Sequence, residues 1–192
     1  IAMFGSTYLL PLYLQLGLGL SPSYVGTLLL PSGLLLALTI AIVGRYSSTH
    51  PTHLMVSFGL VLLALSFALM LTVNLQTGLW VLVAFAILGR IGLGFILPSL
   101  NIGAMRGMDG SLIPQGASAI NFLRMLGGAA GVSLCGILLE WRLAVHGDSL
   151  TVAHTSAARL TAFDEVFVML ACVCLLALFA AWRIRQPQPT RL

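Results

Sequence analysis

The sequence predicts an all-α membrane protein, a bundle of six transmembrane helices. Of the 192 residues, 59% are hydrophobic and 7% are charged, whereas soluble domains carry about 25% charged residues. The mean hydropathy of +1.05 is too high for one soluble core. Long apolar runs also alternate with short polar turns, and ~20 apolar residues cross a bilayer as a helix. These runs predict spans at about 1–20, 24–43, 54–73, 79–102, 116–139 and 164–182.

The first two spans are separated by a short turn. Ser21 is a favoured N-cap and Pro22 a favoured first helical residue, so the second helix should begin there. Proline within a membrane helix is tolerated where neighbours satisfy the freed carbonyl. Pro11, Pro31 and the later Pro98 are therefore expected to mark bends rather than binding sites, although broken helices often lie beside substrate in transporters.

Two spans carry an arginine. Arg90 is about eleven residues from either end of the fourth span, which places it roughly 15 Å deep at 1.5 Å per residue. Arg124 follows Asn121 by one turn in the fifth span. A charge at the bilayer centre costs at least ~2.5–3.5 kcal/mol on insertion scales, so it usually faces protein or water. Both helices should therefore pack inside a bundle.

Each of these polar residues has two readings. Arg90 either pairs with backbone carbonyls or an absent acid, or it lines a translocation path. Arg124 either reaches the near membrane face and braces a gate, or it contacts substrate or relays protons. Asn121 is either an interhelical hydrogen-bonding group or a ligand. In the first span, Tyr13 and Gln15 are candidates to line a cavity.

Glycines follow both arginines at close spacing: Gly92, Gly94, Gly127 and Gly131. Small residues allow membrane helices to approach closely, so these glycines are expected to form packing surfaces, and helices can also slide there.

The remaining polar segments set the orientation. Residues 140–163 form the one sizeable polar segment, and 183–192 form a short basic tail after the 1–182 bundle. Arginines are more numerous on the side that holds the tail, and cytoplasmic loops are rich in Lys and Arg. Both ends of the chain should therefore be cytoplasmic. Trp80, Trp141 and Trp182 fall at predicted span ends, as an interfacial belt requires.

Several classes are disfavoured. The net charge of +4 is small and local in placement, so nucleic acid is not an expected partner. Three cysteines lie in apolar runs, and no metal-ligand spacing, cofactor motif or nucleophile cluster appears. We therefore expect that the protein is not an enzyme and that it binds neither a metal ion nor a cofactor. The acids sit at span ends or in loops, with Asp164 at the outer boundary, so the main proton site is expected elsewhere. The chain begins without an initiator Met or a basic signal-peptide head, and we expect a longer protein.

One family shares these landmarks in the same order along nearly the whole chain. They are residues 10–15, Ser21-Pro22, Gly26, Leu30-Pro31, Gly44-Arg45, residues 90–94, Ile113-Pro114, Asn121-x-x-Arg124, residues 127–131 and residues 163–167. The set resembles the C-terminal half of the fourteen-helix drug–proton antiporter branch of the major facilitator superfamily. The loop after the second span departs from the family pattern, because Ser48 and Thr49 stand where an acid and an arginine are usual. Only Gly44 and Arg45 of that motif remain.

The resemblance implies one half of a multidrug efflux antiporter in the bacterial inner membrane. Its partners would be the lipid bilayer, the absent N-terminal half, an amphipathic small-molecule substrate and protons, with periplasmic adaptor proteins as further candidates. Two alternatives stay open: a transporter of another small solute on the same fold, and a membrane subunit that transports nothing.

Overall fold

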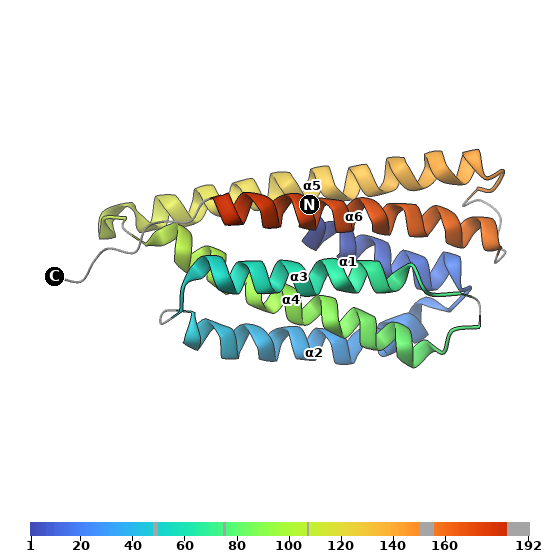
Figure 1. The fold of residues 1–192 in the computed structure, drawn as a ribbon, viewed down its shortest axis with the longest axis horizontal. Helices are drawn as coiled ribbons and strands as arrows, with labels where there is room; N and C mark the ends of the chain where they lie inside the picture. The colour runs from blue at the N-terminus through green and yellow to red at the C-terminus, as the bar shows by residue number, and fades with distance from the viewer. Residues whose placement is uncertain (48–49, 75, 107, 150–155, 184–192) are drawn as a thin grey trace.

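The computed structural model describes residues 1–47, 50–74, 76–106, 108–149 and 156–183, and within these ranges all regular structure is helical. This confirms the predicted all-α fold. The helices run side by side as an elongated bundle (Figure 1). In chain order they are α1 Ala2–Leu12, the π-helical turn η1 Tyr13–Gly17, α2 Pro22–Tyr46, α3 Thr52–Met70, α4 Leu79–Met105, the 3-10 turn η2 Gly110–Leu112, α5 Ile113–Val145 and α6 Ala157–Arg183.

Five helices among the described residues, α2 to α6, are long and apolar enough to cross a membrane. The first predicted span, 1–20, instead forms the 11-residue α1 followed by η1. At 1.5 Å per residue, α1 covers about 16 Å, roughly half of a ~30 Å hydrocarbon core. Pro11 lies at the end of α1 and lacks the N–H that a regular helix requires, and the irregular turn η1 follows it directly.

Several helices extend beyond the predicted spans. α2 begins at Pro22 and Ser21 caps it, since the Ser21 hydroxyl accepts from the Tyr24 N–H at 3.4 Å; this confirms the predicted start. α5 continues to Val145 and α6 begins at Ala157, so most of the expected polar loop 140–163 is helical. Hydropathy marks where a helix is apolar, and polar residues can continue it into the interface. The predicted tail lies, apart from Arg183, outside the described residues.

The helices form a continuous series of contacts. α4 packs closely on α3 and α2, α3 packs on α6, and α1 lies mainly against α5 and α6. Aromatic side chains join three of these elements: the Tyr13 ring meets Phe163 at 5.4 Å and Phe167 at 5.6 Å between centroids, and Phe67 stacks on Phe167. This apolar centre holds η1, α3 and α6 together.

The outer faces of the bundle remain apolar. Leu34, Phe122 and Leu176 are 64%, 66% and 70% exposed, and many other large hydrophobic side chains are exposed. Soluble monomers rarely expose contiguous apolar patches of more than a few hundred Å². A bundle with this exterior is suited to lipid, or to contact with further helices.

Candidate functional site

Arg90 faces another helix within the bundle. It lies in α4, it is half-buried, and its Nη1 donates to the Thr7 hydroxyl of α1 at 3.2 Å. The guanidinium therefore has a protein partner at mid-helix depth, although that partner is a hydroxyl rather than one of the carbonyls or acids that the sequence suggested.

Pro11 adds to the polarity of this contact. Because proline has no N–H, it cannot donate to the carbonyl four residues earlier, which belongs to Thr7. The Thr7 hydroxyl itself donates to the Met3 carbonyl at 2.9 Å and accepts from Arg90. Pro11 and Arg90 are far apart in the sequence. The fold places Thr7, whose carbonyl cannot accept a hydrogen bond from Pro11, beside Arg90.

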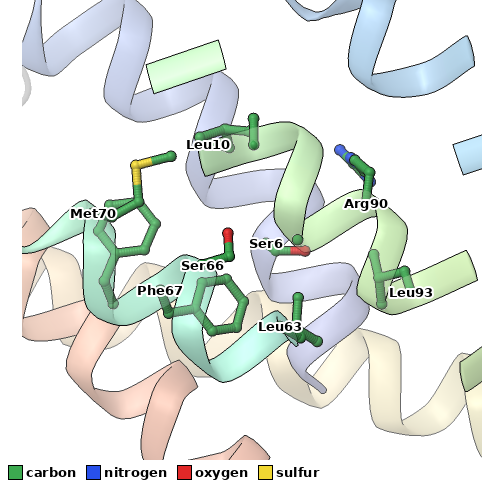
Figure 2. A pocket seen from close by; sticks show the side chains of 11 residues that line it. Ser6, Leu10, Leu63, Ser66, Phe67, Met70, Arg90 and Leu93 are labelled. Atoms are coloured by element: carbon green, nitrogen blue, oxygen red, sulfur yellow. The ribbon is translucent and has the colours of Figure 1, made fainter. Parts of the chain in front are cut away.

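A small hollow lies next to Arg90, among α1, α3, α4 and α6 (Figure 2). Its volume of about 20 Å³ is enough for one water molecule. The lining is apolar except for Ser6, Ser66 and Arg90, which come from three different helices. The Ser66 hydroxyl also ties α3 to α4 by donating to the Phe85 carbonyl at 2.7 Å. The remaining lining residues are Leu10, Leu63, Phe67, Met70, Ala86, Gly89, Leu93 and Phe167.

The other predicted pathway residues lie apart from this hollow. Arg124 Nη2 donates to Asn121 Oδ1 at 2.8 Å within α5, and Asn121 is exposed. Tyr13 is fully buried in the aromatic centre, and Gln15 is half-buried in η1. The five candidates therefore do not form one cluster.

The predicted glycines occupy close helix crossings. A Cβ on Gly92 would lie 2.6 Å from the Gly59 carbonyl oxygen of α3, and one on Gly94 would lie 2.6 Å from Thr39 of α2. On α5, a Cβ on Gly131 would lie 2.7 Å from the Ile1 backbone, while one on Gly127 would lie 3.8 Å from it. The lack of side chains at Gly92 and Gly94 thus lets α4 pack closely against both α3 and α2.

Arg45 remains from the family's loop motif, but another arginine bonds the end of α2. Arg45 is exposed, and nothing prevents a side chain at Gly44. Ser48 and Thr49 lie outside the described residues. Arg106, at the end of α4, donates from Nη2 to the Ser47 carbonyl at 3.0 Å. Ser47 is the C-cap of α2, where a helix leaves carbonyls unpaired, so Arg106 satisfies this end of α2.

The sequence reasoning missed a buried ion pair at the end of the bundle where α5 connects to α6. Arg159 and Asp148 side chains are 1% and 4% exposed, with Nη2 and Oδ1 2.8 Å apart. Arg159 also donates to the Leu16 carbonyl of η1 at 3.2 Å. The ion pair with Arg159, helped by the Ser156 hydroxyl, lowers the pKa of Asp148 to about 2. In sequence the two residues looked like solvated loop charges, and nothing short of the fold pairs them.

A second charged group lies on the same end. Arg142 of α5 donates from Nε and Nη2 to the carboxylate of Glu165 on α6. His146 Nε2 lies 3.6 Å from Glu165 Oε2. Among the described residues, no group of three or more His, Cys, Asp or Glu side chains could hold a metal ion.

Comparisons with known proteins agree with this architecture. The family model of the Major Facilitator Superfamily matches residues 1–132. The chain is 25% identical over 142 residues to the multidrug transporter protein MdtP of Bacillus subtilis, which covers 74% of this chain and 26% of MdtP. It is 25% identical over 163 residues to the methylenomycin A resistance protein of Streptomyces coelicolor, covering 83% of this chain and 34% of that protein.

A third relative covers more of the chain. The putative multidrug resistance protein MdtD of Pectobacterium atrosepticum is 28% identical over 188 residues, which is 95% of this chain and 38% of MdtD. The chain thus spans about a quarter to two fifths of the length of these relatives. With a family model that covers more than half of it, this membrane-embedded helical chain belongs to the Major Facilitator Superfamily.

Proposed function

We propose that this chain is the C-terminal six-span part of a proton-coupled multidrug exporter that works by alternating access. The observation that carries the proposal is the placement of Arg90. In a chain of this superfamily, a guanidinium in the middle of a membrane helix is held toward α1 by Thr7, beside a hollow that also presents Ser6 and Ser66. A charge at this depth costs several kcal/mol in lipid and more often marks a substrate or ion path than a structural role.

The proposal assigns α1 with η1 as the sixth span. The five longer helices cross the bilayer, and the series 2–17 lies alongside them at the end where α5 meets α6. Broken membrane helices are tolerated where they are buried by protein or line a cavity. The π turn and Pro11 therefore support a position for α1 at the substrate path.

The orientation follows the arginine distribution, with both ends of the chain in the cytoplasm of a bacterium and the bundle in the inner membrane. The tryptophans support two interfaces: Trp80 and Trp141 are exposed at the α5–α6 end of the bundle, and Trp182 is exposed near the opposite end. Such exposed rings suit the headgroup level. The α5–α6 connection would then face outward.

The partners of this part are the lipid bilayer, the N-terminal half of the same transporter, an amphipathic small molecule and protons; periplasmic adaptor proteins remain candidates. The two halves would rock about a central cavity. Arg90 would change its exposure to that cavity, since a single hydroxyl at 3.2 Å leaves most of its donors free to bind substrate or water.

A susceptibility panel tests the proposal. The complete gene product that contains this chain is expressed in a bacterial host lacking its own drug pumps, and growth is measured with ethidium and other amphipathic compounds. We expect several-fold higher tolerance to at least one compound, with loss of that tolerance in Arg90→Ala at an equal amount in the membrane. If no compound changes and the same cells accumulate another solute, the chain belongs to a transporter of that solute instead.

Thr7 offers a matched pair for the same assay. Thr7→Ser keeps the hydroxyl that accepts from Arg90, whereas Thr7→Val removes it at nearly constant volume. The tolerance should survive in the first variant and fall in the second. Equal tolerance in both would remove the Arg90–Thr7 contact from the mechanism.

A further inference from the structure

Asp164 lies deeper in its helix than its sequence position suggested. The sequence placed it at the outer boundary of a span, but α6 begins at Ala157. Seven residues at 1.5 Å each put Asp164 about 10 Å along the helix. The residue is half-buried as a whole, while its Oδ1 atom is fully buried and accepts no hydrogen bond from the described residues.

No ion pair compensates this carboxylate among the described residues. Arg142 directs both Nε and Nη2 to Glu165, the next residue along α6, and His146 also approaches Glu165. A guanidinium bound side-on to one carboxylate has committed its two parallel donors. One cation thus serves Glu165, and Asp164 stands beside it without a cation of its own among the described contacts.

Two further buried polar atoms also lack a hydrogen bond among the described residues. The Tyr13 hydroxyl in η1 is buried without a hydrogen bond, and so is His146 Nε2. The Tyr13 ring packs on Phe163, the residue before Asp164. Three of the four buried side-chain atoms that lack a hydrogen bond among the described residues therefore belong to η1, α5 and α6, although His146 Nε2 lies 3.6 Å from Glu165 Oε2.

Three elements contribute charged or titratable side chains around Asp164. α6 contributes Glu165, α5 contributes Arg142 and His146, and η1 contributes Tyr13. Arg159 and Asp148 satisfy each other nearby. α3, which also packs along α6, has His53 as its only titratable side chain, at its far end.

We propose that Asp164 is a proton-binding site of this half of the transporter, loaded from the end of the bundle where α5 connects to α6. A hydronium ion at that end gives its proton to a carboxylate oxygen of Asp164, which forms an O–H bond and leaves water. Protonation removes the negative charge from a half-buried carboxylate whose buried Oδ1 accepts no hydrogen bond from the described residues, and a charge without such a bond is the costly state. The neutral carboxyl also gains a donor for its surroundings. The proton's role in export rests on the proposed function.

Infrared spectroscopy of the complete gene product in detergent tests the site without any transport measurement. During titration from mildly alkaline to mildly acidic pH, the absorbance of protonated carboxyl groups should grow in the parent protein. Asp164→Asn should lose the part of that signal that Asp164 contributes, seen in the difference between parent and variant, and Asp164→Glu should regain it at a shifted position. Glu140→Gln is the matched control, because it removes one carboxylate at an exposed position near the same end of α5.

The outcomes are decisive in both directions. A parent signal that is absent, or one that persists unchanged in Asp164→Asn, overturns the proposal. If the folding of Asp164→Asn fails, Tyr13→Phe provides a second test, since removal of the neighbouring hydroxyl should shift the parent signal. A normal infrared signal together with a failed susceptibility panel would retain the proton site and reject drug export. A normal susceptibility panel without the infrared signal would retain drug export and reject the proton site.

Discussion

At the scale of single residues, the pair Arg159–Asp148 connects three segments that are distant in sequence. Its guanidinium bonds Asp148 and the Ser149 carbonyl in the connection after α5, and the Leu16 carbonyl in η1. Both charges are almost fully covered. A buried charge is tolerated when it is paired and its remaining donors are satisfied, and this pair meets both conditions.

Loss of one partner should therefore destabilise the connection. Asp148→Asn leaves the Arg159 charge buried without its counterion, and the expected loss of stability is up to about 3 kcal/mol, the lower end for buried pairs. Thermal unfolding of the complete gene product in detergent measures it. Asp109→Asn is the control, because it removes the same charge at an exposed position. Equal melting temperatures in the two variants would contradict the role given to the pair.

The same pair predicts a pH dependence. Arg159 lowers the pKa of Asp148 to about 2, below the ordinary value of about 3.9. A depressed acid contributes stability that is fully present above the ordinary value and is lost as the pH falls through about 2. Hydrogen exchange of the segment 145–149, taken relative to the intrinsic rate at each pH, should therefore be slow at neutral pH and should rise below about pH 4.

Asp148→Asn supplies the control for that measurement. Its exchange should be fast at neutral pH and should lack the rise contributed by Asp148. A parent protein whose exchange in this segment stays constant down to about pH 2 would show that the pair does not hold the connection.

At the scale of elements, the crossing of α3 and α4 depends on two glycines that face each other. A Cβ on either Gly59 or Gly92 would lie 2.6 Å from the carbonyl oxygen of the other. Close backbone approach increases van der Waals contact, which is a main attraction between helices in lipid. α4 is thereby held against α3 in the register that presents Arg90 to α1.

Gly92→Val should break this crossing, because the obstructing atoms are backbone and cannot rotate away. Overpacking costs about 1–3 kcal/mol, so the melting temperature in detergent should fall. Gly33→Val is the matched control, since a Cβ at Gly33 of α2 meets nothing within 4 Å. If both variants have the same melting temperature, the glycine crossing does not determine the packing of α4.

The irregular first element shows where sequence reasoning stops. Hydropathy predicted an apolar span at 1–20, and a bend at Pro11 could be anticipated because proline lacks an N–H. The π turn Tyr13–Gly17 could not be anticipated. It depends on contacts from other helices, namely the packing of Phe163 on Tyr13 and the bond from Arg159 to the Leu16 carbonyl.

At the scale of the whole molecule, the sequence predicted much of the fold but few of its contacts. Apolar runs longer than ~17 residues leave little choice besides helices in lipid. That argument identifies five of the six predicted spans as helices of sufficient length. It also predicted that Arg90 faces protein or water, and the structure gives that arginine a partner on α1.

The partners themselves were beyond the sequence, because they join positions far apart in the chain. Arg90 bonds Thr7, 83 positions away, and Arg106 bonds Ser47, 59 positions away. Residues that looked equivalent in sequence also separate in the fold. Arg159 is buried, whereas Arg45 is exposed. Only the packing of helices distinguishes such cases.

The apolar outer faces of the bundle need to be covered by lipid or by other helices. α2 and the first half of α5 expose large side chains such as Leu34, Leu38, Phe122 and Leu126. In a complete transporter these faces would meet lipid or the other half, so variants should be compared in the complete gene product.

The most direct test of the central claim is ethidium efflux from liposomes that contain the complete gene product, driven by an imposed proton gradient. The account predicts gradient-dependent efflux by the parent and at least about tenfold slower efflux by Arg90→Ala, equivalent to about 1.4 kcal/mol in the barrier, at equal reconstitution. Efflux by Arg90→Ala at the parental rate, or no dependence on the gradient in the parent, would contradict it.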